Sequence, residues 1–137
     1  MRQAAQNQRR EMLRRISYIT LWVHEYDACL SFYRDVLEIP LETADENFAQ
    51  FVTEGTKLYL HRSGDKTPLR TQALEIHFEV PDVDAAYNSL LRRSAQFEQS
   101  PANMPWGTRM AALRDPEGNA IEIVGPLALD ESIKGYA

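Results

Sequence analysis

The stretch RDPEGNAIEIVG, residues 114–125, joins a turn to a short strand and determines how the second half of the chain is interpreted. Pro116 sets φ and Gly118 permits a positive φ, so the stretch begins as a turn. The following Ile-Glu-Ile pattern is typical of a strand with one buried face, and it places Glu122 on the opposite face. A carboxylate in the middle of a strand faces water, a metal ion or a ligand.

The same pattern occurs earlier in the chain. EGTKLYL at 54–60 aligns with EGNAIEI at 117–123 at an offset of 63 residues. Upstream, three residues recur at an offset of 57: Val23 with Val80, Asp27 with Asp84, and Ala28 with Ala85. The difference between the offsets fits a longer connection, FEQSPANMPWG at 97–107, in the second copy. Two copies of strand–helix–three strands explain the chain better than one irregular domain.

Alternation and helical spacing predict the elements of each copy. The expected strands are at 16–23, 41–44, 47–53, 56–62, 73–80 and within 114–125, and the expected helices are at 28–37 and 85–93. Asp27 is the expected N-cap of the first helix, and Asp82 or Asp84 that of the second. Arginines and other helix formers near the N-terminus predict an additional, exposed helix.

A copy of about 50 residues is too small to bury both faces of its sheet, so the pair of copies, or a dimer of such pairs, must share a core. We therefore predict an α+β fold: two tandem βαβββ modules forming curved sheets around a cavity, with an extra N-terminal helix. The expected divisions are a helical extension at 1–15, a domain at 16–126 with modules of about 16–62 and 73–126, and a tail at 127–137.

Composition excludes several classes of protein. The net charge of -5 argues against a nucleic-acid partner, since phosphate binding requires a basic surface. The single cysteine excludes an internal disulfide and suits a reducing compartment. No apolar run approaches the roughly 18 residues that span a bilayer, and the N-terminus lacks the apolar core of a signal peptide. We expect a soluble, cytoplasmic protein without a membrane partner.

The repeat also predicts a site. Under the two offsets Tyr18 corresponds to Glu75, and Tyr59 corresponds to Glu122. All four positions lie on the strand face opposite the apolar residues that pack against the helices. If the sheets curl, the four side chains converge in one concavity, and Glu122 faces a cavity.

Three segments, ISYITLWVHEYDACLSFYRDVL, IHFEVPDVDAAY and PWGTRMAALRDPEGNAIEIV, resemble the vicinal oxygen chelate superfamily of glyoxalase I, extradiol dioxygenases, and fosfomycin and bleomycin resistance proteins. The resemblance implies paired βαβββ modules and a dimer whose two cavities are built from modules of both chains. In the metal-dependent members one ligand comes from the first strand and one from the last strand of each module. Those positions here are Tyr18, Tyr59, Glu75 and Glu122, of which two are acids.

Glu75 and Glu122 are the candidate metal ligands, and Glu122 is also the candidate catalytic residue. The alternative is that both are water-facing acids of a strand. His61 and His77 lie two residues beyond Tyr59 and Glu75 on the same faces. Either histidine completes a shifted metal site or is a hydrogen-bonded residue that lines the cavity.

Tyr18, Trp22 and Tyr59 form an aromatic face that is either a platform for a planar or cationic ligand or a packing and dimer surface. Trp106 is expected on a loop at the rim of the cavity, as the resemblance implies. Arg109 either neutralises an anionic ligand or pairs with surface acids.

Two main hypotheses result. The first is a homodimeric small-molecule-binding protein with an incomplete metal-ligand set, holding an amphipathic or cationic ligand in an aromatic and acidic cavity. The second is a lyase, isomerase or dioxygenase in which a divalent metal ion, of unspecified identity, chelates vicinal oxygens of the substrate. A third is docking of the basic N-terminal helix on a partner.

Overall fold

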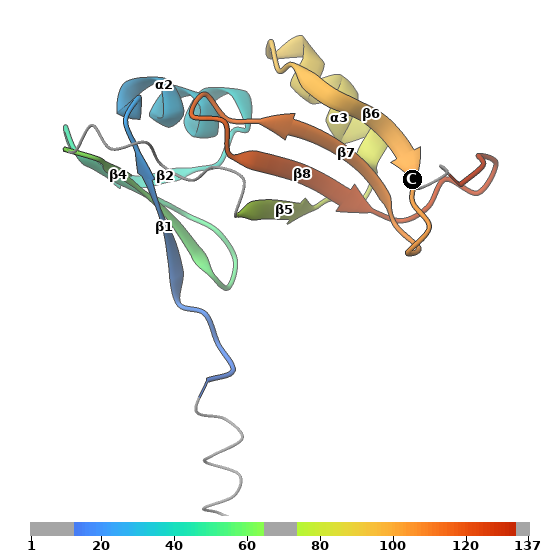
Figure 1. Ribbon diagram of the computed structural model, residues 1–137, viewed down its shortest axis with the longest axis horizontal. Coiled ribbons are helices and arrows are strands. Elements are labelled where there is room, and N and C mark those ends of the chain that lie inside the picture. Colours follow the sequence, from blue (N-terminus) through green and yellow to red (C-terminus); the bar gives the residue numbers. More distant parts are fainter. Residues whose placement is uncertain (1–12, 65–73, 134–137) are drawn as a thin grey trace, which may run out of the picture.

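The computed structural model describes residues 13–64 and 74–133, which form two four-stranded sheets (Figure 1). The first module contains, in chain order, β1 (Tyr18–Val23), α2 (Tyr26–Ser31), η1 (Phe32–Val36), β2 (Leu41–Ala44), β3 (Phe48–Phe51) and β4 (Lys57–Arg62). The second module contains β5 (Glu75–Glu79), α3 (Val83–Arg92), β6 (Phe97–Asn103), β7 (Arg109–Arg114) and β8 (Ala120–Gly125).

The two modules have the same topology. Their strand orders are β1-β4-β3-β2 and β5-β8-β7-β6, and in each the first strand pairs in parallel with the last. This arrangement confirms the predicted α+β class with two βαβββ modules. The expected N-terminal helix lies outside the described residues. Within the described part of the chain, no helix is both long and apolar enough to cross a membrane.

The strand register repeats at the offsets read from the sequence. Thr20 of β1 lies opposite Tyr59 of β4, and His77 of β5 lies opposite Glu122 of β8. The first members of these pairs are 57 residues apart and the second members 63. Tyr59 and Glu122 therefore occupy equivalent positions in the two sheets.

One face of each sheet packs against a helix: in Figure 1, α2 lies above the first sheet and α3 lies behind β6 of the second. Leu58 and Leu60 of β4 and Ile121 and Ile123 of β8 alternate into this buried face. Burying each such side chain contributes about 1.5–3 kcal/mol, so the alternation determines which face is covered. The uncovered side of each sheet is called here the open face, and it carries Tyr59 and Glu122.

The predicted N-cap of the first helix was wrong. The helix begins at Tyr26, its N-cap residue is Glu25, and Asp27 lies inside the first turn. The carboxylate of Glu117, from the DPEG turn of the second module, instead accepts hydrogen bonds from the backbone N–H groups of His24 (2.6 Å) and Glu25 (3.0 Å). A residue distant in sequence therefore satisfies the N–H groups of the N-cap residue and of the residue before it, which are not the donors that Asp27 would bond as an N-cap.

The predicted helix at 28–37 is not a single α-helix. It continues as the π-helical turn η1, in which the N–H of Leu37 donates to the carbonyl of Phe32 at 3.0 Å. The second helix is capped as predicted, because Asp82 accepts a hydrogen bond of 3.1 Å from the N–H of Ala85.

Part of the predicted connection at 97–107 is a strand. β6 occupies 97–103 and pairs with β7, with register shifts between Phe97 and Gln99 and between Gln99 and Ala102. These irregularities, together with Pro101 inside the strand, interrupt the alternation that identifies a strand from sequence. The loop that remains, 104–108, carries Trp106.

Candidate functional site

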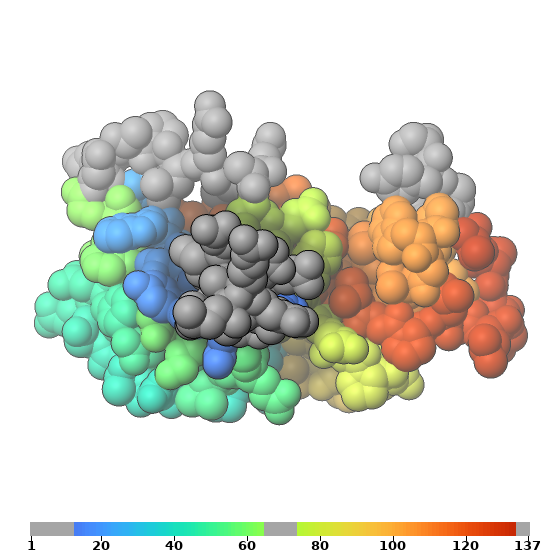
Figure 2. All heavy atoms as spheres, turned by 90° about the horizontal axis from the view of Figure 1, so that it is seen from below, coloured from blue at the N-terminus to red at the C-terminus, as the bar shows by residue number. Residues whose placement is uncertain are grey.

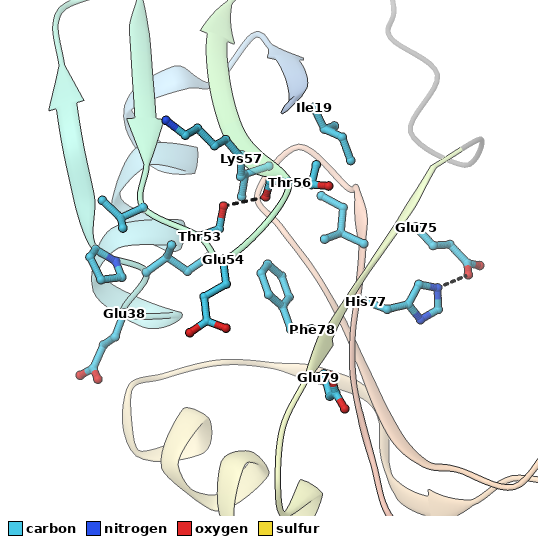
Figure 3. Close-up of a pocket in the computed structure, with 15 residues that line it drawn as sticks. Ile19, Glu38, Thr53, Glu54, Thr56, Lys57, Glu75, His77, Phe78 and Glu79 are labelled. Atoms are coloured by element: carbon cyan, nitrogen blue, oxygen red, sulfur yellow. Dashed lines mark hydrogen bonds and ion pairs between the residues drawn. The ribbon is translucent and has the colours of Figure 1, made fainter. Parts of the chain in front are cut away.

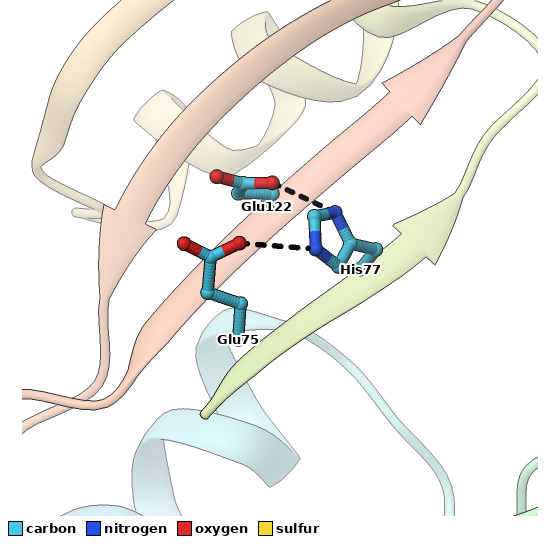
Figure 4. Close-up of side chains that lie close together, drawn as sticks. All are labelled: Glu75, His77 and Glu122. Atoms are coloured by element: carbon cyan, nitrogen blue, oxygen red, sulfur yellow. Dashed lines mark ion pairs between the residues drawn. The ribbon is translucent and has the colours of Figure 1, made fainter. Parts of the chain in front are cut away.

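Three side chains meet on the open face of the second sheet (Figure 4). Glu75 and His77 come from β5, and Glu122 comes from the adjacent strand β8. His77 Nδ1 lies 2.7 Å from a carboxylate oxygen of Glu122, and His77 Nε2 lies 3.3 Å from one of Glu75. The period of two along β5 puts Glu75 and His77 on one face, and the parallel register brings Glu122 beside them.

This acidic triad, Glu75–His77–Glu122, is electrostatically unbalanced. Burial raises the pKa of Glu122 above its usual 4.5, the neighbouring Glu75 raises it further, and His77 opposes both effects. Among the described residues, His77 is the ion-pair partner of both carboxylates. A cation placed beside the triad would favour the ionised form of Glu122.

The triad also has the donor atoms of a metal site. One potential ligand atom from each of the three residues lies within 4.8 Å of the other two. Carboxylate oxygens with an imidazole nitrogen suit divalent ions such as Mn²⁺, Fe²⁺, Ni²⁺ and Zn²⁺. His77, which the sequence offered only as one of two histidines that complete a shifted metal site, lies between the two carboxylates.

A pocket of about 480 Å³ opens beside the triad and is formed by second-module residues. Met104 and Met110 line it, and Trp106, with 53% of its surface exposed, lies on the β6–β7 loop at its edge. The pocket therefore combines carboxylates with an apolar, polarisable wall. The loop position of Trp106 agrees with the sequence-based expectation.

A larger pocket of about 660 Å³ lies between the two modules (Figure 3). Ile19 and Leu58 line it from the first module, and Phe78 lines it from the second. Glu75 and His77 line both pockets, whereas Glu122 lines only the smaller one, so β5 separates the two pockets. Seen from below, the modules lie side by side along the long axis, with blue to green on one side and yellow-green to red on the other (Figure 2).

The open face of the first sheet is aromatic instead of acidic. Tyr18 stacks on Tyr59 with ring centroids 4.9 Å apart, and Trp22 stacks on His61 at 4.1 Å. Tyr18 and Trp22 are 57% and 54% exposed, so much of each side chain remains accessible. We call this group, with Phe48, the aromatic face.

Sequence reasoning missed Phe48. Its ring contacts Tyr59 edge-on at 5.4 Å and His61 at 5.7 Å, so it extends the aromatic face onto β3. The alternation of Phe48 with the buried Ala49 was the available signal. It was too short to assign a face until the pairing with β4 was known.

The four equivalent positions are brought together as two pairs. Tyr18 contacts Tyr59 on the first sheet, whereas Glu75 and Glu122 meet through His77 on the second. The pocket beside the acids is lined from the second module. Within one chain, each module thus presents half of the predicted constellation.

Arg109 lies away from these groups. It is 3% exposed, and its guanidinium donates two hydrogen bonds, of 2.7 and 3.0 Å, to the carboxylate of Asp84 in α3. This pairing holds the pKa of Asp84 below its usual range. Arg109 alternates with Met110, and only Met110 faces the pocket, so the structure does not place Arg109 against a ligand there.

Cys29 is buried, and desolvation raises the pKa of its thiol to about 12. The thiolate that a nucleophile or metal ligand requires is therefore disfavoured, and Cys29 is a packing residue.

Comparison with known proteins identifies the family. A sequence model of the Glyoxalase/Bleomycin resistance protein/Dioxygenase superfamily matches residues 15–123. The uncharacterized protein YraH of Bacillus subtilis (strain 168) is 29% identical over 119 residues, which cover 77% of this chain and 93% of YraH.

Solved structures share the fold. A glyoxalase/bleomycin resistance protein/dioxygenase from Nocardioides superposes with a TM-score of 0.70 at 23% identity, covering 100% of this chain and 99% of that one. The lactoylglutathione lyase of Agrobacterium tumefaciens superposes with a TM-score of 0.66 at 21% identity, covering 80% and 92%. With the family match over most of its length, the chain belongs to the Glyoxalase/Bleomycin resistance protein/Dioxygenase superfamily.

Proposed function

We propose that the protein binds an amphipathic, cationic small molecule in the pocket beside the acidic triad. The observation that carries the proposal is the charge of that pocket. Glu75 and Glu122 share one histidine as their ion-pair partner among the described residues, and no lysine or arginine is among the described residues that line the pocket. A ligand cation would supply the missing positive charge.

The apolar part of the ligand would lie against the wall opposite the acids. Trp106 offers an exposed ring, and Met104 and Met110 adapt to irregular shapes. A third carboxylate at the pocket, that of Glu98, is already paired with Arg114 at 2.6 Å. We therefore assign recognition of the charge to Glu75 and Glu122.

The aromatic face supports a homodimer in which it covers the pocket of a second copy. Tyr18 and Trp22 expose large ring surfaces, as residues at an interface or ligand platform do. Because each module carries half of the predicted constellation, two chains would complete two cavities. The ligand would then be held between an acidic wall and an aromatic one.

A matched pair of tricyclic probes tests the proposal. N-methylacridinium carries a fixed positive charge, whereas acridine at mildly alkaline pH has nearly the same shape without it. We expect isothermal titration to show tighter binding of the cation, and Glu122→Gln to weaken that binding about tenfold, or about 1.4 kcal/mol. Glu42→Gln, an exposed residue of β2, is the control. Equal binding of both probes, unaffected by Glu122→Gln, would overturn the proposal.

A second candidate function is metal-dependent catalysis, which the convergence of three ligand atoms within 4.8 Å favours. Glu75, His77 and Glu122 would hold the divalent ion, which would supply Lewis-acid stabilisation of an oxyanion on vicinal substrate oxygens. Without the ion, burial raises the pKa of Glu122 and favours its protonated form, so binding of the ion there would displace a proton.

Metal analysis separates the two candidates. Protein purified without chelators should contain about one divalent ion per chain if the metal reading holds, and His77→Gln should lose it. Substoichiometric metal in every preparation, with no binding of added Mn²⁺, Ni²⁺ or Zn²⁺ by titration, would exclude this function and leave the first.

A further inference from the structure

The C-terminal segment 126–133 is fastened to the second module by two buried polar residues. Asn103, at the end of β6, is 2% exposed and donates to the carbonyls of Ala128 (2.6 Å) and Glu131 (3.1 Å). Its side-chain oxygen accepts the N–H of Ala128 at 2.9 Å. Asn103 also forms a parallel β-bridge with Ile133.

Arg109, at the start of β7, holds the same segment from the neighbouring strand. Its Nη1 lies 3.2 Å from the side-chain oxygen of Asn103 and 3.2 Å from a carboxylate oxygen of Glu131. The other side of the guanidinium is occupied by Asp84 of α3. A planar guanidinium can bridge three groups in this way, whereas an ammonium cannot reproduce the fork. We call Asn103, Arg109 and Glu131 the clasp.

The clasp stands at the base of the loop that carries Trp106. Asn103 and Arg109 are directly paired across the two strands, and the five residues between them form the loop. Two backbone bonds close the loop, from the N–H of Met104 to Thr108 (2.7 Å) and from the N–H of Gly107 to Met104 (3.1 Å).

The clasp and the pocket lie on opposite faces of the same two strand ends. Met104 follows Asn103, and Met110 follows Arg109, and both methionines line the pocket with Trp106. Asn103 and Arg109 face the C-terminal segment and α3. Because successive side chains of a strand alternate, Met104 and Met110 face the opposite side. Any shift of the backbone at the clasp therefore moves the wall of the pocket.

We infer that Arg109 is a positioning residue for the ligand pocket, acting through the clasp on Met110 and on the Trp106 loop. The C-terminal segment 126–133 packs against the base of the Trp106 loop. The way this segment docks therefore sets the position of the loop and the width of the pocket opening. The inference rests on the proposed function in taking this pocket as the ligand site. It assigns a positioning role to Arg109, which was expected from the sequence either to neutralise an anionic ligand or to pair with surface acids.

Trp106 fluorescence reports the effect directly. The chain has two tryptophans, so Trp22→Phe leaves Trp106 as the single emitter. In this background Arg109→Lys keeps the positive charge but loses the planar guanidinium that bonds Asp84, Asn103 and Glu131 at once. We expect higher acrylamide quenching of Trp106 and a red-shifted emission in this background. Binding is measured with Trp22 retained, because Trp22 belongs to the aromatic face; there Arg109→Lys should bind N-methylacridinium about tenfold more weakly, since misplaced contacts of about 1 Å cost that much or more.

Arg93→Lys is the matched control. Arg93 joins α3 to the first module by bonding the carbonyl of Val36 at 2.7 Å, and it does not touch the clasp. The Arg93→Lys variant should have a lower thermal unfolding midpoint than the parent protein but the same Trp106 fluorescence. Equal changes in both lysine variants would overturn the inference, because they would indicate a general loss of stability.

Glu131→Gln provides a milder variant should Arg109→Lys fail to fold, since Glu131 is largely exposed and belongs to the tail. It should raise the quenching of Trp106 in the same direction, and unchanged quenching in a folded Glu131→Gln protein would overturn the inference. If N-methylacridinium fails to bind the wild-type chain, the proposed function fails, whereas the quenching measurements still decide whether the clasp positions Trp106.

Discussion

The hydroxyl of Tyr33 donates a buried hydrogen bond of 2.8 Å to the carboxylate of Asp115, and this bond joins the two modules. Tyr33 lies in η1, and Asp115 begins the DPEG turn of the second module. Burial, and then the charge of Asp115, raise the pKa of Tyr33, so the hydroxyl stays a donor. Asp115 also accepts bonds of 2.8 Å from the backbone and side chain of Asn119, which hold the turn in place.

Tyr33→Phe should lower the free energy of unfolding by about 1–3 kcal/mol, because the buried carboxylate of Asp115 loses a hydrogen-bond donor. Urea denaturation measures the change. Tyr87→Phe is the control, since among the described residues its hydroxyl makes no hydrogen bond. Equal free energies of unfolding for the Tyr33→Phe and Tyr87→Phe proteins would show that the inter-module bond contributes nothing.

Glu117→Ala should destabilise the protein by about 0.5–2 kcal/mol, because the N–H groups of His24 and Glu25 lose their acceptor at the start of α2. Glu54→Ala removes the equivalent residue of the first module, which is exposed, and should have almost no effect. Both are measured by chemical denaturation. A loss of the same size at Glu54 would contradict the capping role of Glu117.

The stability contributed by Glu122 should depend on pH. Its pKa is raised in the folded protein, so the folded state binds this proton more tightly than the unfolded chain. The resulting stabilisation is fully present below the unfolded pKa and is lost as the pH rises through the folded pKa. The unfolding free energy of the wild type, minus that of Glu122→Gln, should therefore fall between acid and neutral pH. A difference that increases over this range would contradict the raised pKa.

Binding of the cationic probe should have the opposite dependence. Protonation of Glu122 removes the charge that attracts the ligand, so affinity for N-methylacridinium should decline as the pH falls toward the pKa of Glu122. Fluorescence titration at several pH values measures this. Binding that is independent of pH would remove Glu122 from the recognition of charge.

Trp22→Ala should weaken self-association if the aromatic face is the dimer surface. An exposed ring at the centre of an interface typically contributes about 2 kcal/mol or more, or roughly thirtyfold in the dissociation constant. Sedimentation equilibrium measures the change, and Leu91→Ala, an exposed residue of α3, is the control. A monomeric wild-type protein, or a dimer whose dissociation constant is unchanged by Trp22→Ala, would contradict the proposed interface.

The faces of the strands were predictable because alternation is local. The Ile-Glu-Ile pattern of β8 placed Glu122 on the open face, and the same period placed Glu75 with His77. The repeat offsets then predicted which positions of the two sheets are equivalent, and the observed register agrees with them. By contrast, β6 was read as a connection because its bulges break the period.

The amino-acid order alone determined the two βαβββ modules, their buried faces and the equivalence of Tyr18 with Glu75 and Tyr59 with Glu122, since each follows from periodicity within a few residues. Only the tertiary structure decided that Glu117 rather than Asp27 caps the first helix, that His77 bridges the two acids, and that Arg109 clasps the C-terminal segment. The physical reason is that a polar side chain bonds whichever complementary group packing brings within about 3 Å, and that group lies tens of residues away in the chain.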